Sequence, residues 1–556
     1  MLKNKSIIFY IFLALLVWYL FAFAVYPSLV TLTSSLSKNG NFGFDNYKQI
    51  FQSPNLSATF FNTLLLSFST VIICGIIGCS LSLCIHAVQI PFRRIYHIIV
   101  LLPMVVPGTV VVVAYVFLYG VRGFIGWPLR ELLGLPLNSY SIEGFGGILL
   151  IHAFTQYIYF YLLTTEAIER INVSQIEAAK SLGVGKLRTF FQIVFPSFGP
   201  HITGAAVLTF LSASGSFSAP MIIGGNFRVM STEIYFSKQA GYINLAATQA
   251  VLLSLIIIIV IAVIRYYELK CFSGKDFKGS LIPFTPVKNK TISKIATVYV
   301  TILSIIIILP IIAVILISFG KPGRWASVFH DQYTLENYIN VFKNARNIQP
   351  IYNSIIIAFM ATIISAFIGV FASYVITRTK IKGRTLLESV CMLPWILPPS
   401  TILIALIASY NVPNILVLNM TFIGTYWFMP LAFIILRLPV MVRNSSASLI
   451  SLPKSIEEAS KSLGANGFIT FFKVILPMML TGISFSLIIT FIFIMGDYGV
   501  PTFASVANNR PITTAIVNAI GSQRIELGMV YGSCLIVISI VFIGLFSLFT
   551  IKNKKY

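Results

Sequence analysis

Long apolar runs alternate with short polar segments along the whole chain. Twelve runs are read as membrane-spanning helices, because about 20 apolar residues in a helix cross the ~30 Å hydrocarbon core of a bilayer. The pattern therefore predicts an all-α polytopic membrane protein. The runs lie at residues 7–30, 57–87, 96–120, 145–165, 198–215, 245–264, 295–318, 351–376, 387–409, 421–442, 475–496 and 528–551.

The composition supports this class. Of 556 residues, 57% are hydrophobic and 10% are charged, whereas soluble domains have about 25% charged residues. So few charges exclude soluble, secreted, fibrous and disordered proteins. The six cysteines and five histidines show no zinc-ligand spacing, so we expect no metal and no cofactor bound by this chain.

The distribution of basic residues predicts the orientation. If the N-terminus is cytoplasmic and the spans alternate, the cytoplasmic side carries 27 of the 39 Lys and Arg residues and the outer side carries 12. An excess of Lys and Arg marks the cytoplasmic side of a membrane protein. Both termini are therefore expected in the cytoplasm. The membrane topology explains the net charge of +23, so no nucleic-acid partner is expected.

Short segments of the first part of the chain recur in the second part. Six spans separate each segment from its copy, so both copies face the same side and the two halves are expected to be parallel. Up to the third span, the two halves align so that Asn62 corresponds to Asn353. After the third span the alignment shifts to a second register, in which Gly183 corresponds to Gly464. The repeated segments are L-P-x-x-x-P at 102–107 and 393–398, N-T at 62–63 and N-S at 353–354, and E-A-[AS]-K-S-L-G at 177–183 and 458–464.

This repeat divides the chain into two halves of six spans. The first half is expected at 1–270 with its core at about 57–265, and the second at 295–556 with its core at about 350–551. A polar, Lys-rich cytoplasmic linker at 271–294 would join them.

The loop between the fourth and fifth spans of each half is unusually polar for this chain. Its two copies, 166–192 and 444–473, have helical composition and fall on the cytoplasmic side by the charge count. Each short helix is expected to end at a glycine, Gly183 or Gly464, which can adopt the left-handed C-cap conformation.

These loops resemble the EAA signature of permease subunits of ABC-type importers that are fed by binding proteins. The signature is Glu-Ala-Ala, three residues, Gly, nine residues, an aliphatic, any residue, an apolar residue and Pro. Both copies match it over 177–196 and 458–477, with Ser460 for the third Ala and Phe195 for Leu. The resemblance covers most of spans two to six of each half and implies a type I ABC importer fold. It implies that a coupling helix docks on the ATPase through Glu177, Ala178, Ala179, Gly183, Glu458, Ala459, Ser460 and Gly464.

The chain has no P-loop, since G-V-G-K-L at 183–187 lacks the leading glycine and the Ser or Thr. It is therefore not expected to be an enzyme, and ATP would be hydrolysed by separate ABC ATPase subunits, a homodimer on the cytoplasmic side. The resemblance also implies an extracytoplasmic solute-binding protein and a multi-pass location in the bacterial plasma (inner) membrane.

A fused permease with one EAA loop in each half resembles the group that handles iron(III), 2-aminoethylphosphonate and thiamine. The segments after the fifth spans look most similar to the iron(III) branch, so ferric iron is the first expectation. A trivalent cation suits spans with so few acids poorly, and a small anion suits them better, so the substrate stays open. Asp497 is an acid near the membrane, which indicates function, although a hydrated helix end is the alternative. The expected pathway residues are Asp497, Tyr498, Ser216 and Phe217.

A secondary transporter of twelve spans in two parallel halves is the alternative from another class. Such a protein would couple to protons or sodium through buried acids, and the predicted spans are nearly bare of acids. The ATP-driven importer is therefore the preferred interpretation.

Overall fold

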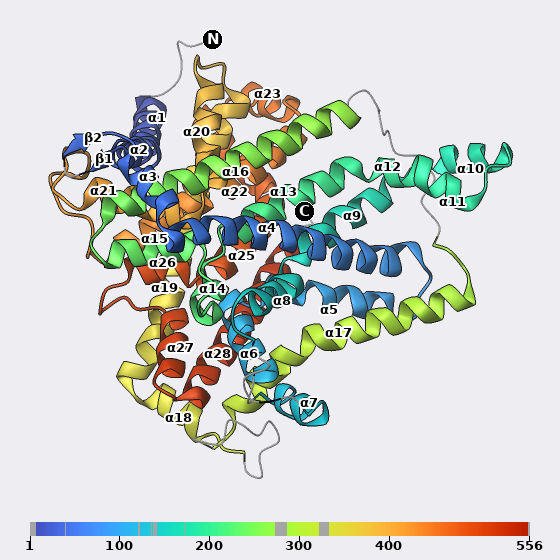
Figure 1. Ribbon diagram of the computed structural model, residues 1–556. Coiled ribbons are helices and arrows are strands. Elements are labelled where there is room, and N and C mark those ends of the chain that lie inside the picture. The colour runs from blue at the N-terminus through green and yellow to red at the C-terminus, as the bar shows by residue number, and fades with distance from the viewer. Residues whose placement is uncertain are drawn as a thin grey trace.

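The computed structural model describes residues 7–38, 40–120, 123–134, 136, 142–171, 173–272, 286–321 and 333–553. In these ranges the protein is a bundle of helices with a short antiparallel hairpin of β1 (Ser37–Lys38) and β2 (Asn41–Phe42) (Figure 1). The first part of the chain forms α1 (Ile7–Leu20), η1 (Phe21–Val25), α2 (Tyr26–Ser35), α3 (Asp45–Gln52), α4 (Pro54–Ser82), η2 (Leu83–Ala87), α5 (Arg93–Val105), α6 (Gly108–Tyr119), α7 (Gly126–Leu132), α8 (Phe145–Thr155), α9 (Tyr157–Glu169), α10 (Val173–Ser181), α11 (Lys186–Thr189), η3 (Phe190–Val194), α12 (Phe195–Ser197), α13 (Gly199–Ser214), α14 (Ser218–Ile223), α15 (Met230–Gln239) and α16 (Ile243–Phe272). The second part forms α17 (Lys290–Ser318), α18 (Glu336–Lys343), α19 (Ala345–Arg378), α20 (Arg384–Ile396), α21 (Pro399–Tyr410), η4 (Ile415–Val417), α22 (Phe428–Ser451), α23 (Ser455–Ser462), α24 (Gly467–Ile469), η5 (Thr470–Ile475), α25 (Leu476–Gly496), α26 (Gly499–Ala504), α27 (Ile512–Gly521) and α28 (Ile525–Asn553).

The predicted spans are confirmed in number. Within the described ranges, eight helical segments are long and apolar enough to cross a membrane alone, and four bent helix pairs bring the total to as many as 12. Each of these overlaps one of the apolar runs read from the sequence.

Of the four bent pairs, two bend by more than 90°, which the runs 96–120 and 387–409 did not indicate. α5 and α6 meet at an angle of 105°, and α20 and α21 meet at 109°. Pro107 and Pro398 stand at the N-cap of α6 and of α21. Proline has no backbone N–H and its ring clashes with the preceding turn, so it tends to kink or break a helix. The repeated L-P-x-x-x-P segments therefore mark a sharp bend in each half.

The helix α17 begins within the predicted linker. α17 begins at Lys290, with the Asn289 side chain accepting hydrogen bonds from the backbone N–H groups of Thr291 and Ile292. Such an N-cap satisfies donors that have no partner inside the helix. Residues 290–294 are therefore helical, while 273–285 lie outside the described residues. The division of the chain at 270 and 295 stays a prediction.

Paired glycines bring the main helices of each half close together. A methyl group on Gly78 in α4 would lie 2.5 Å from the carbonyl oxygen of Tyr157 in α9, and one on Gly369 in α19 would lie 2.6 Å from Cβ of Met441 in α22. The register that aligns Asn62 with Asn353 also aligns these two glycines, so they occupy the same place in the repeat. Small residues let membrane helices pack at short distance, where van der Waals contact replaces the missing hydrophobic drive.

The first span of each half packs on the other half. α1 and α2 lie against α20 and α21, where Tyr410 donates a hydrogen bond to the carbonyl of Ala22. α17 lies in the same way against α5 and α6, and the hydroxyls of Tyr96 and Thr301 are 2.7 Å apart. The two halves are therefore interlocked by an exchange of their first spans.

Candidate functional site

The short helices α10 and α23 occupy the predicted EAA loops. Figure 1 shows α10 on an arm that projects from the bundle, and α23 at the top of the view. The glycine after each helix has positive φ, +76° at Gly183 and +83° at Gly464. The N–H of Val184 donates to the carbonyl of Ala179 at 3.0 Å, and a matching bond of 3.1 Å closes the second helix. These are Schellman caps, so the predicted left-handed C-caps are confirmed.

The first two residues of each EAA triplet face outward and the third faces inward. Glu177 and Ala178 are exposed, as are Glu458 and Ala459. At the third position, Ala179 and Ser460 are buried.

The serine that departs from the signature has a partner. The hydroxyl of Ser460 lies 3.0 Å from that of Thr470, at the start of the returning π-helix η5. The equivalent threonine of the first half, Thr189, instead donates to the carbonyl of Gly185 at 3.2 Å. The Ser460–Thr470 bond ties α23 to the segment that leads into the next span.

An exposed leucine stands beside each capping glycine, which the sequence interpretation missed. Leu182 is 83% exposed and Leu463 is 88% exposed, at equivalent places in the repeat. Exposed large apolar residues that recur on two matched elements favour an interaction surface. The available signal was the shared Leu-Gly ending, which the sequence interpretation treats only as the end of a helix.

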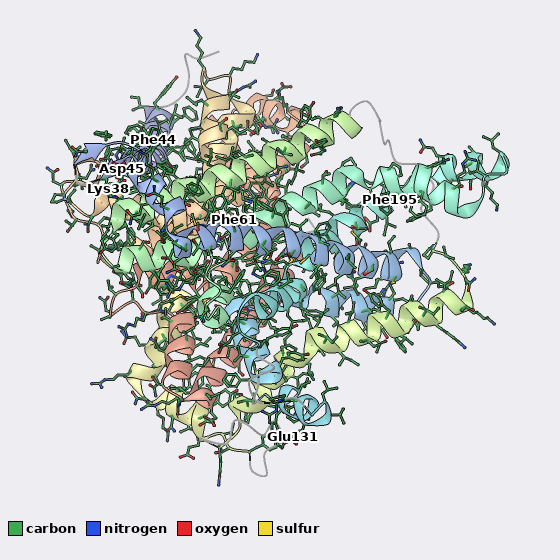
Figure 2. The ribbon with its side chains drawn as sticks, in the orientation of Figure 1. Lys38, Phe44, Asp45, Phe61, Glu131 and Phe195 are labelled. Atoms are coloured by element: carbon green, nitrogen blue, oxygen red, sulfur yellow. The ribbon has the colours of Figure 1, made fainter. Side chains whose placement is uncertain are left out.

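The EAA arm and the β-hairpin region lie on opposite sides of the bundle. In Figure 2, Phe195 on the arm is far from Lys38, Phe44 and Asp45 beside α3, with Phe61 of α4 between them.

The predicted pathway residues Phe217 and Tyr498 meet between the halves. Their ring centroids are 6.1 Å apart, and Phe217 also lies 5.6 Å from Phe503. Phe217 and Tyr498 are 7% and 8% exposed. Because they are equivalent in the repeat, this contact lies at the pseudo-two-fold axis of the two halves.

Two reciprocal glycine contacts flank this aromatic pair. Gly215, just before Ser216, approaches Pro398 and Pro399 of the second half. Its repeat counterpart Gly496, just before Asp497, approaches Pro107 of the first half. The prolines that bend each half therefore touch the end of the fifth span of the other half.

Asp497 is paired with a cation that the sequence interpretation gave no role. Oδ2 of Asp497 lies 3.7 Å from a guanidinium nitrogen of Arg437 in α22, and both side chains are about one-fifth exposed, at 19% and 21%. Oδ1 accepts a hydrogen bond of 2.8 Å from the N–H of Val500. The Arg437 guanidinium also lies over the ring of Phe493, at 4.9 Å. A charged residue inside an apolar run was the available signal.

The first half has neutral groups at the corresponding place. Ser216 stands where the second half has Asp497, and its hydroxyl bonds Nε2 of His152 at 2.9 Å. Nδ1 of the same histidine bonds the hydroxyl of Thr70 at 3.1 Å. The four predicted pathway residues therefore lie in one region, and of these four it is Asp497 that carries a charge.

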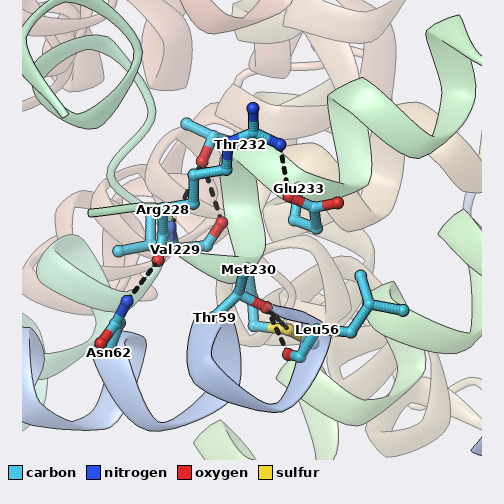
Figure 3. Close-up of polar contacts among 8 residues, drawn as sticks. All are labelled: Leu56, Thr59, Asn62, Arg228, Val229, Met230, Thr232 and Glu233. Carbon is cyan, nitrogen blue, oxygen red and sulfur yellow. Dashed lines mark hydrogen bonds and ion pairs between the residues drawn. The ribbon is translucent and has the colours of Figure 1, made fainter. Parts of the chain in front are cut away.

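The repeated Asn-Thr/Ser pairs hold the segment that follows the fifth span. In the first half, Asn62 donates to the carbonyl of Arg228 at 3.0 Å, and Arg228 forms an ion pair of 3.5 Å with Glu233 (Figure 3). Asn353 repeats the amide bond to the carbonyl of Arg510 at 3.0 Å. These contacts fix the start of α15 and the approach to α27, beside the predicted pathway.

The described residues contain no group of three or more His, Cys, Asp or Glu side chains that could hold a metal ion. Of the five histidines, His330 lies outside the described residues.

Comparison with known proteins gives consistent relatives. The chain is 26% identical over 549 residues to the probable ABC transporter permease protein y4fN of Sinorhizobium fredii, covering 97% of this chain and 96% of the relative. It is 24% identical to the ferric transport system permease protein FbpB of Actinobacillus pleuropneumoniae, covering 95% and 76%. It is 27% identical over 203 residues to the putative 2-aminoethylphosphonate permease PhnU of Salmonella typhi, covering 35% and 68%.

Two parts of the chain, residues 86–269 and 365–552, match the family described as binding-protein-dependent transport system inner membrane component. Each match contains one EAA helix and the spans around it. The chain therefore belongs to this family, as a fused, two-half permease subunit of an ABC importer in the inner membrane.

Proposed function

We propose that this permease is driven by ATP and carries ferric iron, delivered by an extracytoplasmic binding protein, into the cytoplasm by alternating access. The observation that carries the proposal is the pair of exposed helices α10 and α23, one in each half, with matched glycine caps.

The exposed faces of these helices are the proposed docking surface for the ATPase. Glu177 and Leu182 on one, and Glu458 and Leu463 on the other, combine a carboxylate with an exposed leucine. Two matched helices suit a homodimeric ATPase, because a two-fold partner offers the same groove twice. Closure of that dimer on ATP would draw the helices together and open the permease outward, and hydrolysis would reset it. Both termini would then lie in the cytoplasm, and ATP would be bound by the partner.

The region around Phe217 and Tyr498 is the proposed pathway. The aromatic contact would close it in the present conformation, with Ser216 on one side and Asp497 on the other. Asp497 is paired with Arg437. A passing cation could therefore bind the carboxylate, and a passing anion could bind the guanidinium.

Two substrates agree with different observations. Full-length similarity to permeases named for ferric transport supports iron. The guanidinium of Arg437 and the similarity to a permease named for 2-aminoethylphosphonate support that anion instead.

Purification and transport test the function together. The tagged chain, purified from host membranes, is expected to co-purify with a P-loop ATPase. In proteoliposomes with that ATPase and its binding protein, we expect ATP-dependent uptake of 55Fe(III). If labelled 2-aminoethylphosphonate is taken up and iron is not, the substrate is this anion. Uptake that needs a proton or sodium gradient and no ATP would instead identify a secondary transporter and refute the proposal.

A further inference from the structure

Each half has an apolar cluster beneath its coupling helix, and the two clusters are copies of each other. In the first half Ile168, Ile171 and Phe198 form its centre. The second half has Leu449, Leu452 and Met479 at the equivalent positions, in the register that aligns the two capping glycines. In the first half Ile176 of α10 packs on this cluster.

The rims of the two clusters differ in chemistry. In the first half Ala87 and Ile176 pack against the cluster, so these two rim positions are apolar. Their counterparts in the repeat are Arg378 and Glu457. Nε of Arg378 lies 3.0 Å from Oε1 of Glu457, and the two side chains are 7% and 16% exposed. These two atoms are not aligned for a hydrogen bond, so the contact is an ion pair.

Arg378 also binds the end of α22. One of its terminal nitrogens donates to the carbonyls of Leu449 and Leu452, both at 2.7 Å. The last carbonyls of a helix lack partners within the helix and carry partial negative charge, so a guanidinium is well placed there. Because Arg378 is the last residue of α19, its side chain joins the ends of α19 and α22 to α23.

We propose that Arg378 is a positioning residue that makes the second coupling helix a stiff lever, whereas the apolar Ala87 and Ile176 stand at the equivalent places of the first half. The proposal rests on the proposed docking of α10 and α23 on an ATPase. A charged, three-way contact has a fixed geometry, since the planar guanidinium donates in set directions. An apolar rim lets its members slide. Movement of α23 is therefore transmitted directly to α19 and α22, and the two halves respond unequally to one symmetric motor.

The experiment compares Arg378→Ala, the double variant Arg378→Ala/Glu457→Ile, and Lys380→Ala. The double variant installs the apolar rim of the first half, and Lys380 is an exposed basic residue two positions further on. Each is reconstituted with the ATPase and the binding protein. The readouts are co-purification of the ATPase, stimulation of ATP hydrolysis by the binding protein, and the midpoint of thermal unfolding.

Arg378→Ala is expected to keep the ATPase bound but to lose at least about fivefold of the stimulation, the low end of usual coupling energies. Lys380→Ala is expected to behave as the unmodified chain. The double variant is expected to recover the midpoint, because no buried carboxylate is left unpaired, but only part of the stimulation. Full stimulation in Arg378→Ala, or full recovery in the double variant, overturns the positioning role. If Arg378→Ala does not accumulate, Glu457→Gln decides, and unchanged stimulation there overturns the proposal.

Failure of the proposed function has another signature. The unmodified chain would then not co-purify with an ATPase at all. A stable complex in which Arg378 has no effect on stimulation refutes only the role of Arg378.

Discussion

The reciprocal glycine contacts between the halves predict two unequal effects from the same substitution. Gly215→Ala and Gly496→Ala each add one methyl group at equivalent places in the repeat. At Gly496 the methyl carbon would lie 2.6 Å from Cβ and 2.9 Å from Cα of Pro107. At Gly215 the nearest atoms, Cδ of Pro399 and the carbonyl oxygen of Leu211, are both 3.3 Å away.

The size of the effect follows from these distances. Two carbon atoms attract each other best at about 3.5–4.0 Å, so the methyl group at Gly496 would be about 1 Å too close. Its neighbours are a proline ring and backbone, which cannot rotate away. The carbonyl of Gly496 also accepts a hydrogen bond of 2.9 Å from Thr109, which opposes a shift of the helix end. We expect Gly496→Ala to cost about 2–3 kcal/mol, near the upper end for overpacking, and Gly215→Ala to cost less than about 1 kcal/mol.

The measurement is the midpoint of thermal unfolding of the purified chain in detergent, followed by scanning fluorimetry. Gly496→Ala should lower the midpoint clearly, and Gly215→Ala should leave it nearly unchanged. Both variants are also assayed for uptake, because the contacts lie beside Phe217 and Tyr498. Equal midpoints for the two variants, or a lower midpoint for Gly215→Ala, would refute this reasoning about the interface.

Three further predictions test the coupling helix, the helix packing and the ion pair. Gly464 has φ +83° and open space around it, so Gly464→Val should lower stimulated ATP hydrolysis through backbone strain of about 1–3 kcal/mol. Gly464→Asn should retain most of the stimulated hydrolysis. Equal hydrolysis in the two variants would contradict the role of the left-handed conformation. Gly369→Leu should push α19 away from Met441 and lower the unfolding midpoint, and an unchanged midpoint would show that the close approach is not needed. Arg437→Gln and Asp497→Asn should each impair uptake and lower the midpoint, since each leaves a charge that is only about one-fifth exposed without its partner. The cost should stay below the about 3–5 kcal/mol of a fully buried pair, and the double variant should be more stable than either single variant. Unchanged uptake in Asp497→Asn removes it from the pathway.

Much of the architecture could be predicted because it depends on local composition. An apolar run of sufficient length must be a helix in a membrane, since only a helix satisfies its own backbone groups there. The left-handed caps at Gly183 and Gly464 could be predicted for a similar reason, because glycine adopts positive φ without the steric cost of a side chain. The prolines of the L-P-x-x-x-P repeat were recognised in the sequence. Because they lie inside continuous apolar runs, the bends of 105° and 109° were not predicted.

The candidate site could be predicted only in part. Asp497, Tyr498, Ser216 and Phe217 were predicted as pathway residues from the repeat and the rarity of acids, and the structure brings them into one region. Arg437 was missed, because it lies on another span, far from Asp497 in the sequence, and no local pattern joins them. The ion pair of Arg378 and Glu457 was missed for the same reason.

The sequence alone determined the number of spans, their parallel duplication and the two EAA helices, because hydrophobic length, repetition and glycine conformation act within a few turns of the chain. Only the tertiary structure decided which half each first span covers, which prolines meet Gly215 and Gly496, and that α23 is anchored by an ion pair. Those features depend on contacts between residues that are distant in the chain, and such contacts exist only after the helices have packed.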